Sequence, residues 1–182
     1  MKKIFLLALA LVSPAIPSAL CNTSFGNAVG FNDGWRFMPA DSAAMSLPEY
    51  PDSTWRQLSL PHDWSIEMLP APTLNSCTGY YPGGIGWYRK TFLTPDDGAE
   101  RHFIYFEGIY NRSEVYLNGH LLGRRPNGYV SFAYNMTPWL RPAGEPNTLA
   151  VRVDHSREAD SRWYTGSGIY RDVWLVSASE TR

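Results

Sequence analysis

Short stretches in which apolar and polar residues alternate recur along the chain. A period of two is typical of half-buried β-strands. After residue 21, no stretch of twelve or more residues has a convincing helical period. The candidate strands are residues 35–37, 55–60, 86–94, 101–107, 114–123, 129–134, 149–154 and 170–176. Short strands separated by Gly, Pro and Asn clusters predict an all-β domain, as an antiparallel sandwich, jelly roll or barrel.

Asn118–Gly119 gives the clearest local signal, because an Asn-Gly pair suits the two positive φ angles of a type I′ hairpin turn. Both sides of the segment 101–107 carry apolar residues, so we expect it to be buried on both faces. We expect a single helical turn at 137–140, a polar lead-in at 22–31 and a long surface loop at 38–52.

The first 21 residues have the character of a secretory signal peptide. Lys2 and Lys3 precede the nine-residue apolar run Ile4–Val12. That run is too short to span a bilayer, which takes about 20 residues. We therefore expect residues 1–21 to be removed, and residues 22–182 to form one exported domain, periplasmic or extracellular.

Cys21 leaves a second interpretation open, in which it becomes the acylated first residue of a lipoprotein. Ser18–Leu20 precede it in a poor order for that signal, so a lipid anchor at Cys21 is the less favoured reading. With ordinary cleavage, Cys77 is either a lone thiol or, if Cys21 is retained, a candidate partner for it. Two cysteines make neither a disulfide scaffold nor a metal site.

Composition narrows the function. The net charge is −1, from 16 basic and 17 acidic residues without a run of like charges, which argues against nucleic acid as a partner. Aromatic residues make up 14% of the chain, with 7 Trp and 11 Tyr. Their rings stack on sugars, although large aromatic residues more often fill cores. At 182 residues the chain has room for one domain.

Familiar catalytic motifs are missing from the sequence. It contains no Gly-x-Ser-x-Gly and no His-Glu-x-x-His. Its glycine-rich stretch Gly83–Gly86 leads into a predicted strand, so it lacks the helix N-terminus that a phosphate-binding loop needs. His62 and Asp63 are a candidate acid and base, but neighbours on an extended chain point to opposite faces.

Two clusters remain that composition does not explain, Leu60–Trp64 and Arg162–Leu175. The second places charged residues beside large aromatic ones around a glycine-containing bend. Carboxylate and guanidinium groups bind sugar hydroxyls while a ring stacks on the sugar. A structural Arg–Asp pair supported by aromatic residues is an equally good interpretation of the same residues.

An ordered series of motifs resembles the start of family 2 glycoside hydrolases. The resemblance covers 31–176, nearly all of the expected mature chain. The matching motifs are Asp33–Phe37, Leu60–Trp64, Gly86–Phe92, Phe106–Gly108, Val115–Gly119, Asn127–Tyr129, Phe132, Asn147–Val153 and Arg162–Leu175. Several motifs at matching spacing make the resemblance highly specific.

The resemblance implies a galactose-binding-like jelly roll, followed in the family by an immunoglobulin-like domain and an α/β barrel. Members of the family hydrolyse β-galactosides, β-glucuronides or β-mannosides with retention, using two glutamates of the barrel about 5 Å apart. The expected partners are therefore a β-galactoside or related carbohydrate and the downstream domains. We expect this chain alone to be non-catalytic.

The resemblance also implies site residues. The aspartate of the Ser-Gly-Ile-aromatic-Arg-Asp-Val motif, Asp172 here, is expected to meet sugar hydroxyls and, in some β-galactosidases, a sodium ion; the complete enzyme would also use Mg²⁺. Asp172 favours β-galactosides over β-glucuronides. An asparagine expected before the Gly-aromatic-Tyr strand is replaced by Gly83–Ile85, which weakens the case for a sodium site. The candidate substrate-binding residues are Asp172, Arg162, Trp163, His62 and Asp63.

Other functions stay open at this stage. The chain fits an independent carbohydrate-binding module, a domain of a β-glucuronidase or β-mannosidase, or a scaffold that organises neighbouring domains and binds no sugar. A reading frame that continues past Arg182 into an immunoglobulin-like segment and a barrel with two glutamates would support the glycosidase domain, whereas a stop codon there would favour the independent module.

Overall fold

A computed structural model describes residues 20–23, 26–157 and 161–179, with side chains from residue 26 onward except that of Cys77. Residues 1–19 lie outside the described residues, and the side chains of Leu20 and Cys21 are not described, so the signal peptide and the role of Cys21 stay predictions. None of the described helical segments is long and apolar enough to cross a membrane. The described part is all β, which confirms the predicted class. Its strands are β1 Leu20–Thr23, β2 Gly26–Gly30, β3 Trp35–Met38, β4 Arg56–Leu58, β5 Gly84–Leu93, β6 Arg101–Phe106, β7 Ser113–Leu117, β8 His120–Arg125, β9 Phe132–Asn135, β10 Pro146–His155 and β11 Val173–Ala178.

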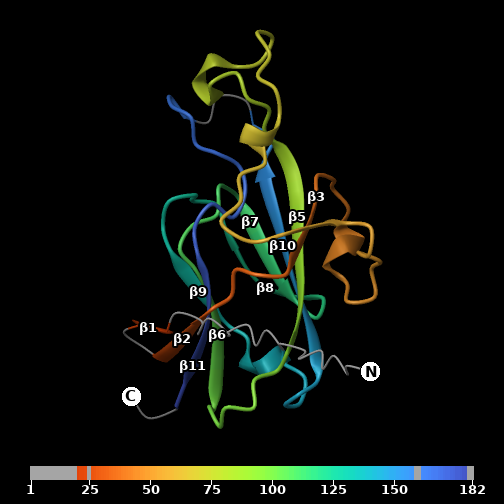
Figure 1. The fold of residues 1–182 in the computed structure, drawn as a ribbon, viewed down its shortest axis with the longest axis vertical. Helices are drawn as coiled ribbons and strands as arrows, with labels where there is room; N and C mark the ends of the chain where they lie inside the picture. The colour runs from red at the N-terminus through yellow and green to blue at the C-terminus, as the bar shows by residue number, and fades with distance from the viewer. Residues whose placement is uncertain (1–19, 24–25, 158–160, 180–182) are drawn as a thin grey trace, which may run out of the picture.

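Two antiparallel sheets pack face to face (Figure 1). One has the strand order β1-β2-β11-β6-β9, and the other has the order β4-β3-β5-β10-β7-β8. The long strands β5 and β10 pair over their whole length, from Gly84 opposite His155 to Leu93 opposite Pro146. Within the described residues, four 3₁₀ turns occur in the connections, at Ala43–Ser46, Ser65–Glu67, Ser76–Thr78 and Thr137–Trp139. The last is the predicted turn.

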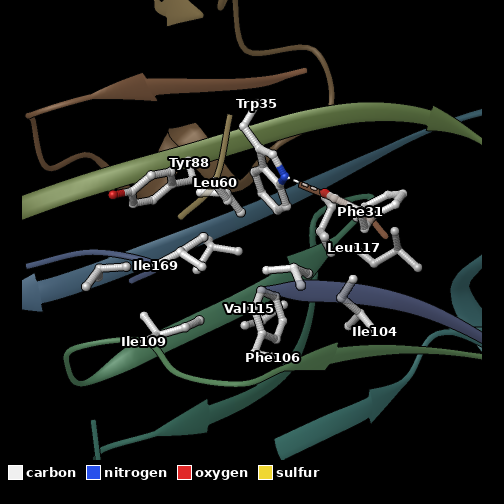
Figure 2. Close-up of a cluster of buried hydrophobic side chains, with 14 of the residues drawn as sticks. Phe31, Trp35, Leu60, Tyr88, Ile104, Phe106, Ile109, Val115, Leu117 and Ile169 are labelled. Carbon is white, nitrogen blue, oxygen red and sulfur yellow. Dashed lines mark hydrogen bonds between the residues drawn. The ribbon is translucent and has the colours of Figure 1, made fainter. Parts of the chain in front are cut away.

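The core lies between the sheets and follows from strand alternation. In β7, Ser113, Val115 and Leu117 are buried while the residues between them are half-buried. Figure 2 shows Val115 and Leu117 meeting Ile104 and Phe106 of the other sheet. Burying one such apolar side chain contributes about 1.5–3 kcal/mol.

Trp35 shows how the core also satisfies polar groups. Its ring is fully buried, and its indole N–H donates to the Phe31 carbonyl at 2.8 Å (Figure 2). A buried donor without an acceptor would lose about 1–3 kcal/mol, so this bond lets a tryptophan fill the site.

The predicted hairpin is confirmed. Asn118 and Gly119 have φ angles of 50° and 84° and connect β7 to β8. The Asn118 side chain donates to the carbonyl of Trp139 and accepts from the backbone N–H of Thr148, so the turn is also anchored to β10.

Three expectations are corrected by the structure. Residues 22–31 are not a plain lead-in, because β1 and β2 occupy them and β2 pairs with β11. β6 buries one face fully, through His102, Ile104 and Phe106, while its other face is half-buried. The last strand begins at Val173 rather than at residue 170, so Asp172 precedes it. Sequence alternation alone overstated the burial of β6. It also placed the beginning of β11 too early, because pairing with β6 starts at Val173.

The segment 38–52 is a loop, as predicted, but it is anchored over one sheet. The buried Arg89 of β5 donates to the carbonyls of Met45 and Leu47, the latter at 2.9 Å, and to the carboxylate of Asp52 at 2.9 Å. The loop lacks the regular backbone hydrogen bonds of a sheet, and the buried guanidinium bonds several of its oxygens instead.

Candidate functional site

The two sequence clusters come together at one end of the sandwich. The backbone N–H of His62 donates to the Ile169 carbonyl at 2.8 Å, and that of Trp64 donates to the Ser167 carbonyl at 3.1 Å. We call this region the loop end; it consists of residues 61–83, 126–131, 155–157 and 161–170, and its yellow and blue segments lie at the top of Figure 1. The sequence predicted both clusters but not their pairing.

Gly168 permits this close approach. Its φ is +128°, and a Cβ there would lie 2.6 Å from the His62 carbonyl oxygen and closer still to the Tyr88 hydroxyl. Only glycine adopts that conformation and leaves that space. The glycine-containing bend predicted around residues 166–168 therefore serves packing between the two clusters.

Asp63 joins the clusters through its carboxylate. One oxygen accepts hydrogen bonds from the backbone N–H groups of Ser65, at 3.0 Å, and Ser167, at 2.8 Å. The other accepts from the Tyr164 hydroxyl at 2.5 Å. Burial, together with this contact, raises the pKa of Tyr164. Asp63 was predicted to bind substrate, but both of its oxygens are engaged inside the domain.

His62 is buried and similarly occupied. Its Nδ1 lies 2.7 Å from the Tyr88 hydroxyl and its Nε2 lies 2.6 Å from a guanidinium nitrogen of Arg56. The same Nε2 lies 3.3 Å from Glu67 Oε1. Arginine can only donate and its contact is the shorter one, so it favours a neutral ring in which Nε2 accepts and Nδ1 carries the proton. Burial lowers the pKa of His62, and the nearby Glu67 carboxylate opposes that effect only in part.

A buried polar chain lies beside these residues. Ser167 Oγ is 2.6 Å from Ser65 Oγ and 2.6 Å from His155 Nδ1, and Ser65 Oγ donates to the Pro82 carbonyl at 2.7 Å. Ser167 is fully buried, so this serine–histidine contact is closed to a substrate. Its effect is to tie the bend to β10 and to the segment before β5.

Arg162 and Trp163 lie on the surface of the loop end. Both side chains are exposed, and the Trp163 indole N–H donates to the Tyr129 hydroxyl at 3.0 Å. Sequence reasoning missed Tyr129, which lies in the resemblance motif Asn127–Tyr129 but carries no charge signal. These side chains are free to meet a ligand from solvent.

A hollow of about 310 Å³ opens between residues 74–84 and 155–157. Its polar lining includes Asn75, Thr78, Tyr81 and Arg157. Other hollows of the described surface reach 390 and 410 Å³, so volume does not single this one out. Its position and chemistry distinguish this hollow from the others, because it adjoins both sequence clusters and offers hydroxyl, amide and guanidinium groups together.

Residues 86–171 match the protein family described as "Glycosyl hydrolase 2 galactose-binding domain-like".

This chain is a galactose-binding-like domain of glycoside hydrolase family 2.

Similar proteins are much longer than this domain. A β-galactosidase of Bacteroides ovatus, BoGH2A, is 51% identical over 148 residues, which are 80% of this chain and 17% of the relative. A "putative beta-glucuronidase" of Formosa agariphila is 43% identical, over 83% of this chain and 15% of that protein. The crystal structure of a β-glycosidase from Bacteroides vulgatus superimposes with a TM-score of 0.78 at 48% identity, covering 83% of this chain and 20% of that one. The domain thus spans 15% to 20% of their lengths.

Asp172 of the galactose-binding-like domain makes its side-chain hydrogen bond with Asn32 and not with one of the other four candidate residues. It directly precedes β11, is half-buried, and accepts a hydrogen bond from the Asn32 side-chain amide at 2.9 Å. Asn32 in turn accepts from the backbone N–H of Val173. Its predicted contact with sugar hydroxyls stays a prediction.

The sodium ion that the resemblance implies at Asp172 stays a prediction. The nearest described partner, Asn32, turns an N–H rather than an oxygen toward the carboxylate. Among the residues that the structure describes, no three His, Cys, Asp or Glu side chains gather as metal ligands.

Proposed function

We propose that this chain is the non-catalytic sugar-binding domain of an exported family 2 glycosidase that breaks down β-galactosides. In this proposal the loop end borders the active site that the catalytic domain of the complete enzyme supplies. The observation that carries the proposal is the meeting of both sequence clusters at the end of the sandwich that holds the hollow, where Arg162 and Trp163 are also exposed.

The engaged state of the loop-end carboxylates supports a non-catalytic role. Asp63 accepts three hydrogen bonds within the domain, and Glu67 pairs with Arg56 at 2.8 Å. A retaining glycosidase needs two carboxylates free to act as nucleophile and as acid and base. Arg157 and Arg162 are exposed at the loop end, and their donors suit sugar hydroxyls and the positioning of a substrate.

β-Galactosides are favoured as the substrate class by the B. ovatus relative at 51% identity. A β-glucuronide is the alternative substrate, since the Formosa relatives are named β-glucuronidases. An independent carbohydrate-binding module remains the second candidate function, and the exposed aromatic rings of the loop end favour it.

A chimera tests the role at the active-site edge. This domain replaces the matching segment of the B. ovatus β-galactosidase, and hydrolysis of nitrophenyl β-galactoside is measured. We expect the chimera to be active and the double variant Arg157→Ala/Arg162→Ala to lower kcat/KM about tenfold with an unchanged Tm, because lost charged hydrogen bonds cost about 1.5 kcal/mol or more.

Arg141→Ala is the matched control, because Arg141 is exposed at the opposite end of β10, where it donates to the Pro146 carbonyl. An unchanged kcat/KM in the double variant would contradict the edge role. Turnover by the isolated chain, freed of contaminating enzyme, would contradict the non-catalytic role.

A further inference from the structure

Two exposed aromatic side chains of the loop end form a fixed pair. Trp163 is 60% exposed and Tyr129 is 48% exposed, although each is large and apolar. The indole N–H of Trp163 donates to the Tyr129 hydroxyl at 3.0 Å, so the two rings are held together across two loops. Large exposed rings that are held in place mark binding surfaces more often than isolated surface residues do.

The pair is supported from below. The Tyr129 ring packs edge to face on Tyr110, with ring centres 5.4 Å apart. Tyr110 is buried and packs in turn on His155, with ring centres 5.0 Å apart. Asn127 Oδ1 accepts from the backbone N–H of Tyr129 at 2.8 Å, which holds that loop. A ligand therefore meets rings that are already ordered, and binding costs little side-chain entropy.

The same contacts connect the pair to the hollow of the loop end. His155 lines the hollow at one side. At the other side, Tyr81 lines it and packs on Tyr164, the neighbour of Trp163, with ring centres 5.6 Å apart. A ligand that filled the hollow could thus extend onto the Trp163–Tyr129 pair.

The surroundings of the pair are polar. Arg162 and Asn127 are exposed beside the rings. A pyranose has an apolar C–H face that stacks on a ring and a rim of hydroxyls that bind guanidinium and amide groups. A purely apolar partner would leave these polar groups without hydrogen bonds when it covered them.

We propose that Trp163 and Tyr129 form a stacking platform for one sugar ring of an oligosaccharide, adjacent to the hollow. This inference rests on the proposed function and deepens it, because it makes an oligosaccharide, rather than a single sugar, the ligand of the domain.

The chain contains a matched control for Trp163. Trp139 is 44% exposed, but one of its faces is covered by His120, with ring centres 4.1 Å apart. It lies near Asn118 and the beginning of β10, whereas the loop end adjoins the other end of that strand. Trp139→Ala removes an exposed tryptophan without touching the proposed platform.

Isothermal titration calorimetry of the full chain with β-1,4-galactotriose tests the platform directly. We expect Trp163→Ala to weaken binding at least about fivefold, because it removes the stacking ring. We expect Tyr129→Phe to weaken binding less, since the ring stays and only the hydroxyl that orients Trp163 is lost. Trp139→Ala should bind like the wild type, and all three variants should keep the circular dichroism spectrum of the wild type.

Unchanged affinity in Trp163→Ala, or no binding of galactotriose by the folded wild-type chain, would overturn the platform. Equal loss in Trp139→Ala would overturn it as well, because the effect would then be nonspecific. These outcomes leave the proposed function standing, since that is tested by hydrolysis in the chimera with the Arg157→Ala/Arg162→Ala variant and not by binding to the isolated chain.

Discussion

Replacing Asp63 by alanine tests whether its carboxylate stabilises the loop end, through the change in the free energy of unfolding. The substitution removes the acceptor for the backbone N–H groups of Ser65 and Ser167, and both of these residues are buried. It also removes the acceptor for the Tyr164 hydroxyl. Each buried donor left without an acceptor costs about 1–3 kcal/mol. Allowing for partial hydration, we expect Asp63→Ala to lower the free energy of unfolding by about 2–4 kcal/mol.

Asp63→Asn refines the test. The amide oxygen can still accept from both N–H groups, and the amide nitrogen can donate to the Tyr164 oxygen. We therefore expect a loss of about 1 kcal/mol or less. Asp96→Ala is the control, because Asp96 is exposed in the connection after β5. Guanidinium denaturation followed by tryptophan fluorescence gives the free energies.

Hydrogen exchange at the Ser167 amide locates the effect, since that amide should lose protection in Asp63→Ala. A stability of Asp63→Ala within about 0.5 kcal/mol of the wild type would refute the reasoning, because that is the range of a surface substitution. A loss of sugar binding at unchanged stability would instead restore the substrate-binding role that the sequence predicted for Asp63.

The remaining predictions concern pH, backbone conformation and export. Burial lowers the pKa of His62 below 6.5. The contribution of His62 to stability is therefore present above that pH and is lost as pH falls through the lowered pKa. Denaturant melts from pH 7 to 5 should show that His62→Gln loses stability less steeply than the wild type. Gly168→Ala should cost about 2–4 kcal/mol from strain and overlap, whereas Gly30→Ala, which has open space and an ordinary φ, should be nearly neutral in thermal melts. Mass spectrometry of protein secreted by a bacterial host should show cleavage between residues 18 and 22; an intact Met1 would refute the signal peptide, and a diacylglycerol adduct on Cys21 would establish the lipid anchor.

The fold could be predicted from local patterns because strand alternation and the Asn118–Gly119 turn are encoded in neighbouring residues. The first strands could not be predicted, since β2 has a weak alternation and is held by pairing with β11, far along the chain. The start of β11 at Val173 depends in the same way on its register against β6.

The sequence identified residues of the candidate site, but it could not show which of them bind ligand and which hold the loops together. The Leu60–Trp64 motif singled out His62 and Asp63, yet only three-dimensional contacts show that their polar atoms are engaged by Tyr88, Ser65 and Ser167. An aspartate looks the same in sequence whether it binds a sugar or a backbone N–H group. Tyr129 was missed because its significance comes from Trp163, which lies 34 residues away.

The central claim is that the loop end borders the active site of a family 2 glycosidase. The most direct measurement is a crystal structure of the B. ovatus chimera with the active site labelled by a 2-deoxy-2-fluoro-galactoside, which traps the covalent intermediate. The account predicts that Arg162 and Trp163 line the opening of the labelled site. A structure in which the loop end faces solvent, away from the trapped sugar, would contradict it.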